Sequence, residues 1–152
     1  MEIIKPEEYA VSEWAGGKTT QLYIYPQGSE YAKRNFLLRI SSATVECERS
    51  EFTSLPQVER IILPLSGSLH LFYEGHGEKK LEPFEQDRFD GGWKTVSVGR
   101  ATDFNVMLRE GTQAQVRLLD VNPNEQASVE VAANGLTAVF AAQGGDHAIS
   151  AV

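Results

Sequence analysis

The sequence predicts an all-β fold, either a barrel or a sandwich. None of the 152 residues lie in a segment that keeps a helical apolar period over three turns. Short apolar or alternating runs recur instead, and Gly, Pro or Asn residues separate them. The clearest pair is 61–65 and 69–73, which flank Ser66-Gly67-Ser68. This pattern is typical of two strands joined by a tight turn.

The chain from Arg60 to Gly75 is therefore expected to form the central hairpin. Gly67 is the residue that we expect at a positive φ, because glycine has no Cβ to oppose it. Pro64 has no backbone N–H to donate to a neighbouring strand. A bulge or a sheet edge is expected just before the turn.

The other expected strands are short, and the regions between them are expected to be turns. The glycine-rich stretch 12–21 is interpreted as a loop, and 76–80 as a charged turn. The tail 143–152 has little strand pattern. The expected strands are 2–9, 22–25, 36–41, 43–47, 95–98, 102–110, 113–121, 127–131 and 136–142.

The composition indicates one domain spanning residues 1–152, without an obvious linker. A formal net charge of −7 with scattered basic residues argues against a nucleic-acid partner or an anionic membrane surface. Cys47 is the single cysteine, so no disulfide can form within the chain. The first residues lack a signal-peptide pattern, and no apolar run approaches a membrane span. We expect a cytoplasmic protein.

Familiar catalytic and metal-binding motifs are missing. Gly16-Gly17-Lys18-Thr19 resembles part of a P-loop, but Ser12 stands where another glycine is needed, and a strand pattern follows in place of a helix. His70, His76 and His147 are far apart in sequence, so we expect neither a metal nor another cofactor. Cys47 lies between two glutamates, which oppose thiolate formation, and is interpreted as structural.

Polar residues within apolar strands are the stronger candidates for a site. If the strands close around one cavity, these side chains could share it, as small-molecule sites are mostly apolar with few polar groups. A second interpretation stays open: Arg39 lies on a solvated face, Arg60 pairs with a surface carboxylate, and Asp103 and Asn105 satisfy turn backbone groups. The candidate ligand-binding residues are Trp14, Arg39, Ser41, Arg60 and Asn105.

Several motifs together resemble the HutD/Ves family. They are W-A-G-G-K-T-T-Q at 14–21, R-I-S at 39–41, F-T-S-L-P at 52–56, F-D-G-G at 89–92 and D-F-N-V-M at 103–107. The family pattern has an asparagine before the paired glycines, where this chain has Ala15, and commonly a Glu where it has Gln21. The part after Gly111 resembles the family only loosely and is short.

The resemblance implies a cupin-type (RmlC-like) fold with two fused barrels, a bicupin, in which the C-terminal barrel is reduced or completed by another chain. We therefore include a homodimer among the expected assemblies. Metal-binding cupins carry an H-x-H strand, whereas this chain has Leu69-His70-Leu71-Phe72, so the resemblance favours a cupin without metal.

Two functions remain open from the sequence. The first is a regulatory protein that binds a small carboxylate such as N-formylglutamate, because family members near histidine-utilisation pathways are thought to do so, while Ves-type members are linked to temperature stress. Arg39 and Arg60 would then bind the carboxylate. The second is a metal-free isomerase, epimerase or hydrolase acting on a sugar or amino-acid derivative, with His70 or Asp103 as its base.

Overall fold

A computed structural model describes residues 2–142 and contains ten strands in two antiparallel sheets. The all-β prediction is confirmed. Two short 3-10 turns, Pro6–Glu8 and Tyr31–Lys33, are the helical elements of the described residues. The strands are β1 (Ala10–Trp14), β2 (Gly17–Tyr25), β3 (Leu38–Val45), β4 (Arg49–Glu51), β5 (Glu59–Gly67), β6 (Leu69–Tyr73), β7 (Gly77–Leu81), β8 (Asp87–Asp90), β9 (Thr95–Val98) and β10 (Ala101–Leu108).

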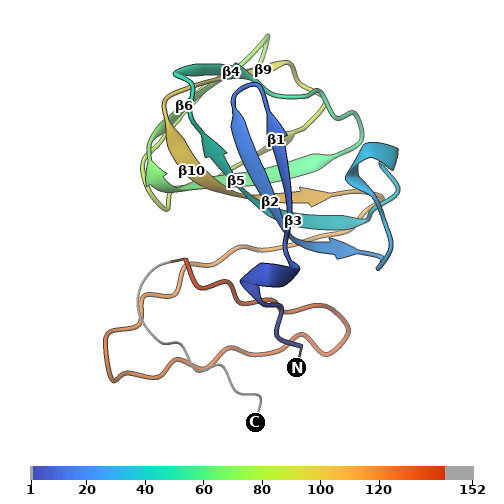
Figure 1. The fold of residues 1–152 in the computed structure, drawn as a ribbon, viewed down its shortest axis with the longest axis vertical. Coiled ribbons are helices and arrows are strands. Elements are labelled where there is room, and N and C mark those ends of the chain that lie inside the picture. Colours follow the sequence, from blue (N-terminus) through green and yellow to red (C-terminus); the bar gives the residue numbers. More distant parts are fainter. Residues whose placement is uncertain (1, 143–152) are drawn as a thin grey trace. The chain divides into compact units, whose positions relative to one another are not determined.

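The two sheets form a sandwich (Figure 1). The larger sheet has the order β1-β2-β3-β10-β5-β8, and the smaller has the order β4-β9-β6-β7. Strand β10 lies between β3 and β5, although about 35 residues or more separate it from each of them in sequence. Three segments that are remote in the chain thus become neighbours at the centre of the larger sheet.

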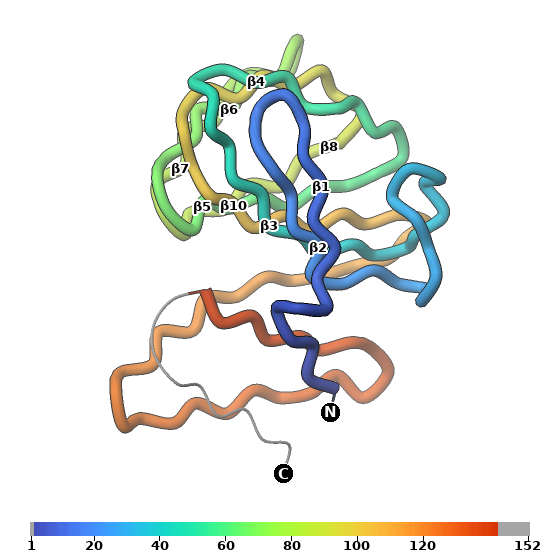
Figure 2. Tube along the Cα trace, in the orientation of Figure 1, coloured from blue at the N-terminus to red at the C-terminus, as the bar shows by residue number. Residues whose placement is uncertain are grey.

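The chain divides into two compact units, residues 3–116 and residues 117–152 with the first two residues. All ten strands belong to the first unit, and residues 117–142 follow an extended path without a strand (Figure 2). The strands expected at 113–121, 127–131 and 136–142 are wrong. Their apolar side chains are largely exposed, with Val131 at 75%, and they pair with no strand among residues 2–142. The second barrel stays a prediction, and 143–152 lie outside the described residues.

Three local expectations are also corrected. Residues 2–9 hold a 3-10 turn in place of a strand, because Pro6 begins it and the Glu8 carboxylate accepts the Lys5 N–H at 2.7 Å. The stretch 12–21 is a hairpin, in which only Ala15 and Gly16 lie between β1 and β2. Residues 77–81 form strand β7, which pairs with β6.

Strands β5 and β6 do not form the expected hairpin. They follow one another directly, but β5 pairs with β10 and β8, whereas β6 pairs with β7 and β9 in the other sheet. Gly67 lies at this corner with the expected positive φ of 72°, and a Cβ there would be 2.3 Å from the Arg100 carbonyl oxygen. The bulge is confirmed, since Asp103 pairs with Pro64 and Thr102 with Ser66.

The two faces of the larger sheet bury different side chains. Its outer face buries Ile61, Val106 and Leu108 beneath Ala114 and Val116. Its inner face contributes Ile62 and Ala101 to the cluster that β6 builds with Leu69, Leu71 and Tyr73. Polar side chains share this inner face, which places them between the sheets. Within residues 2–142, no helix has the length and apolar character needed to cross a membrane.

Candidate functional site

Arg39 and Arg60 lie on the same inner face, on either side of Met107. Met107 of β10 pairs with Arg39 of β3 and with Arg60 of β5, and residues paired across neighbouring strands point to the same side of a sheet. Two strand spacings separate the arginine backbones, roughly 10 Å. The side chains are 5% and 6% exposed. Both arginines therefore lie in the interior of the sandwich.

Arg39 is held by one hydrogen bond and one aromatic ring. Its Nε–H donates to Gln21 Oε1 at 2.8 Å, and its guanidinium carbon lies 4.2 Å from the centroid of the Tyr31 ring. Burial lowers the pKa of Arg39, with a further lowering by the charge of Arg34. Gln21 supplies a neutral acceptor at this position, and among residues 2–142 no carboxylate forms an ion pair with Arg39.

Arg60 lies among aromatic rings and glycine backbone. Its guanidinium carbon is 4.7 Å from the Phe52 ring centroid and 5.3 Å from that of Phe89. A Cβ on Gly91 would come within 3.2 Å of the Arg60 Cδ and 2.7 Å of the Val58 oxygen, so only glycine fits against this side chain. Burial lowers the pKa of Arg60, while the Asp103 charge opposes that shift.

Asn105, Ser41 and Asp103 occupy the next two rows of the same face. Asn105 pairs with Ser41 and Ile62, and Asp103 pairs with Ala43 and Pro64. Burial raises the pKa of Asp103 to about 7, although the Arg60 charge and a hydrogen bond from the Ala43 backbone both act to lower it. A carboxyl with this pKa exchanges its proton near neutral pH.

The interior also contains polar atoms without partners. Ser97 of β9 pairs with Leu71 and Ser50, so both serines face the core from the smaller sheet. Buried polar atoms are nearly always hydrogen-bonded, which makes a group of exceptions informative. Among residues 2–142, the buried side-chain atoms without a hydrogen-bond partner are Ser50 Oγ, Arg60 Nε, Ser97 Oγ, Asp103 Oδ1 and Asn105 Oδ1.

The second interpretation of these residues, as solvated or surface-paired side chains and turn residues, is wrong. Within the part of the chain that the structure describes, neither Arg39 nor Arg60 forms an ion pair with a carboxylate. Asp103 and Asn105 lie within β10 rather than in a turn, at 2% and 4% exposure. Four of the predicted site residues, Arg39, Ser41, Arg60 and Asn105, thus share one inner face.

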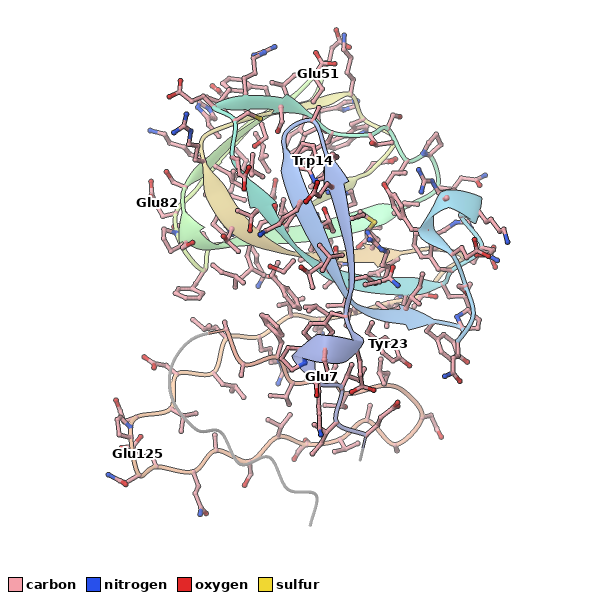
Figure 3. All side chains as sticks on the ribbon, viewed as in Figure 1. Glu7, Trp14, Tyr23, Glu51, Glu82 and Glu125 are labelled. Carbon is pink, nitrogen blue, oxygen red and sulfur yellow. The ribbon has the colours of Figure 1, made fainter. Side chains whose placement is uncertain are left out.

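Trp14 lies apart from the arginines. It ends β1 beside the β1–β2 turn (Figure 3). Its ring lies against Gly16, where an added Cβ would be 2.0 Å from a ring carbon of Trp14. It pairs with Gly17, which pairs with Val45, six residues and roughly 20 Å along β3 from Arg39. A surface hollow of about 420 Å³ lies here, lined by Trp14, Lys18, Glu46 and Cys47 among others. Its role in ligand binding stays a prediction.

The other candidate groups have local partners. His70 Nε2 lies 2.6 Å from Glu78 Oε2, and His76 stacks on Trp93 with ring centroids 3.9 Å apart. The Cys47 Sγ donates to the Arg49 carbonyl oxygen at 3.2 Å. His147 lies outside the described residues. Across residues 2–142, no three His, Cys, Asp or Glu side chains gather closely enough to hold a metal ion.

Sequence reasoning missed the residues that surround the guanidinium groups. Phe52, Phe89 and Gly91 belong to the motifs F-T-S-L-P and F-D-G-G, which were a usable signal, although no role was given to them. No sequence pattern pointed to Tyr31, because its contact with Arg39 depends on how the Tyr31–Lys33 turn packs in three dimensions. This turn lies in the connection that leads directly into β3, and no local sequence pattern shows that the connection folds back over Arg39.

The paired antiparallel sheets and the polar interior define a protein of the cupin fold. The HutD family model matches residues 6–151, and the chain belongs to the HutD family. No curated protein matches the sequence significantly.

Solved structures agree with this fold. A conserved protein of unknown function, PA5104 from Pseudomonas aeruginosa PAO1, is similar with a TM-score of 0.60 at 24% identity. The match covers 68% of this chain and 55% of the PA5104 chain. HutD from Pseudomonas fluorescens SBW25 has a TM-score of 0.59 at 22% identity, with 69% and 58% covered. Ectoine synthase from P. lautus reaches 0.57 at 10% identity, with 71% and 78% covered. The chain therefore spans less than two thirds of the length of the first two structures.

Proposed function

We propose that this HutD-family protein binds a small carboxylate metabolite, of the N-formylglutamate kind, at Arg39 and Arg60, and that it has a regulatory rather than a catalytic role in the cytoplasm. The observation that carries the proposal is the pair of buried guanidinium groups, neither of which forms an ion pair with a carboxylate among residues 2–142. A buried charge is costly unless it is paired. A ligand carboxylate supplies the missing negative charge.

The chemistry of arginine fits this role. A guanidinium group presents a planar fork of N–H donors that matches a carboxylate, and it stays charged in a desolvated site where a lysine loses its proton more readily. The unpaired Nε of Arg60 provides one such donor. Two arginines whose backbones lie roughly 10 Å apart suit a ligand with two acidic groups, one toward each side of Met107.

Aromatic rings lie over the guanidinium groups of both arginines. Tyr31 covers Arg39 from the 3-10 turn Tyr31–Lys33, and Phe52 covers Arg60 from the connection between β4 and β5. Connections of this kind move more readily than paired strands. A ligand replaces the cation–π contact with a charged hydrogen bond, and the ring swings aside while the strand holds the arginine in place.

Isothermal titration calorimetry with N-formylglutamate, glutarate and sugar acids tests the proposal. Arg39→Met and Arg60→Met remove the charge and keep the length of the side chain, so each is expected to abolish binding that the wild type shows. The matched control is Arg88→Met, which removes an exposed arginine paired with Glu59. Absence of binding to a broad panel of acids by the wild type, or equal binding by all three variants, contradicts the proposal.

A second function has one observation in its favour. Asp103, with its pKa raised to about 7, is suited to general acid–base chemistry near neutral pH, as a metal-free isomerase, epimerase or hydrolase needs. Turnover of a sugar or amino-acid derivative that is lost in Asp103→Asn, with ligand binding retained, would replace the regulatory role with an enzymatic one.

A further inference from the structure

We propose that the outer face of the smaller sheet binds a second copy of this chain, and that a two-fold axis running across the strands relates the two copies. The face consists of the outward side chains of β4, β9, β6 and β7, in the strand order of that sheet. The ligand site proposed above lies on the opposite, inner side, so the two proposals stand or fall separately. The face is also distinct from the C-terminal part of the chain, where the sequence predicts a second barrel.

The centre of this face is apolar. Burial alternates along β6 and β9, and the residues between the buried ones face outward. Val96 pairs with Phe72, and Val98 pairs with His70, whose ring lies 4.1 Å from that of Phe72 between centroids. Phe72 and Val98 are 38% and 37% exposed. The solvated side of an antiparallel sheet is usually polar, so exposed apolar side chains on the two central strands indicate a contact surface.

Charged side chains border the apolar centre at both edges of the sheet. They are Arg49 and Glu51 on β4, and Glu78 and Lys80 on β7, and all four are exposed (Glu51 is labelled in Figure 3). Strand pairing places Arg49 and Lys80 in one row across the sheet, and Glu51 and Glu78 in the next row, roughly 7 Å away. An apolar centre within a charged rim is the usual composition of a protein interface.

This pattern of charges is complementary to itself. When two copies of a sheet pack face to face with aligned strands, the two-fold axis between them runs either across the strands or along them. An axis across the strands exchanges the two rows, so Arg49 faces Glu51 of the second copy. Lys80 likewise faces Glu78 of the second copy. Opposite charges therefore meet at all four corners of the face.

An axis along the strands gives the reverse result. It keeps the rows and exchanges the edges of the sheet, so Arg49 faces Lys80 of the second copy. Glu51 then faces Glu78 of the second copy. Like charges placed together across an interface are costly, and the charges therefore select the axis across the strands.

The rim charges are mostly free to make these contacts. Among residues 2–142, Arg49, Glu51 and Lys80 form no ion pair, while Glu78 contacts His70. A shallow hollow of about 340 Å³ on this face leaves room for a protruding side chain. Four strands span only about 20 Å, which is small for an interface, so we expect a dissociation constant of about 10 µM.

Analytical ultracentrifugation of the full chain over a concentration series tests the proposal. Arg49→Glu and Glu51→Arg each bring like charges together twice in a symmetric dimer, so each should weaken the dimer at least about tenfold. The double variant restores opposite pairs and should return to within about threefold of the wild type. The matched controls are Lys33→Glu and Glu30→Arg, which make the same charge changes at an exposed pair outside this face.

A variant without a charge change gives a second test. Phe72→Ser removes the exposed ring from the apolar centre and should weaken the dimer at least about tenfold. The side chains changed on this face are all exposed, so the variants should fold, and thermal unfolding checks this.

Each outcome decides the proposal. A wild type that stays monomeric at about 100 µM overturns it and leaves the face to a different protein. A dimer that no change on this face weakens is joined elsewhere on the chain, which also overturns it. Single reversals that strengthen the dimer, or a double variant that does not recover, overturn the axis across the strands and the proposal with it.

Discussion

Arg60 is a buried cation, and we expect its burial to lower the stability of the ligand-free protein. It is buried beneath Phe52 and beside Gly91, its Nε has no hydrogen-bond partner, and no carboxylate of residues 2–142 forms an ion pair with it. Replacing such a cation with an apolar side chain of similar length removes the desolvation cost. We therefore expect Arg60→Met to raise the free energy of unfolding by roughly 1–3 kcal/mol in urea denaturation.

The control for this experiment is again Arg88→Met. Arg88 is half exposed and pairs with Glu59 on the surface, so its loss should cost less than about 1 kcal/mol. A loss of about 2 kcal/mol or more in Arg60→Met would mean that Arg60 is a structural cation, and the ligand proposal would lose its main support.

The raised pKa of Asp103 predicts that its contribution to the stability of the fold falls as the pH rises. Because burial raises the pKa of Asp103 from 3.8 to about 7, the folded state holds this proton more tightly than the unfolded chain. The stabilisation that the protonated carboxyl contributes to the free energy of unfolding is fully present below pH 3.8. It is lost as the pH rises through about 7. Asp103→Asn, which cannot ionise, should gain stability relative to the wild type across that range.

Urea denaturation of the two proteins at several pH values measures this difference. The charge of Arg60 acts on Asp103, and Tyr31, Tyr73 and Arg39 act in turn on Arg60; all four remain in both proteins. A constant difference between variant and wild type from pH 4 to pH 7 would show that Asp103 titrates as an exposed carboxyl does.

Alternation alone could predict which residues of β10 share a face, but not which of the two faces is the inner one. Asp103 and Asn105 alternate with Phe104 and Val106, which fixed the two sets of residues but not which set faces the core. The outer set is buried too, beneath Ala114 and Val116. Since a sheet covered on both sides has two apolar environments, hydrophobicity could not assign the inner face.

At the scale of elements, Gly67 is the corner that turns β5 into β6. Alanine there would place its Cβ 2.3 Å from the Arg100 carbonyl oxygen, in addition to the strain of a φ of 72°. Gly75 is a matched control, with a φ of 76° and no heavy atom within 4 Å of the added Cβ. Gly75→Ala should cost about 1–2 kcal/mol from strain alone, and Gly67→Ala roughly 3 kcal/mol or more.

Thermal and urea denaturation of the two variants give the comparison. An equal loss of unfolding free energy in Gly67→Ala and Gly75→Ala would mean that the backbone at the corner shifts to make room for a side chain. The close approach of Gly67 to the Arg100 carbonyl would then not be required for the fold.

Strands could be predicted where turn residues bound an apolar or alternating segment. The strands with which they pair could not be predicted. Residues 95–98 and the bulge near Pro64 follow from local chemistry. The pairing of β5 with β10 and β8, in place of β6, depends on the closure of two sheets and has no local signal. Ala127–Val131 has a strand pattern but no strand to pair with among residues 2–142.

At the scale of the whole molecule, the ten strands and residues 117–142 should differ in protection from solvent. Amide hydrogen exchange followed by mass spectrometry is expected to show slow exchange in 38–45 and 101–108, whose strands have a neighbour on each side. Peptides from 117–142 should exchange within seconds, because no strand ladder protects them. Slow exchange there would indicate that this segment pairs with a further strand, as a second barrel or a second copy would provide.

We propose that Arg39 and Arg60 bind the carboxylate of a ligand between the two sheets. The most direct test is an NMR titration of the arginine Nε–Hε signals with N-formylglutamate, assigned by the Arg39→Met, Arg60→Met and Arg88→Met variants. The signals of Arg39 and Arg60 should shift together and saturate, while that of Arg88 stays in place. Shifts confined to Arg88 and other surface arginines, with those of Arg39 and Arg60 unmoved at saturating ligand, would contradict the account.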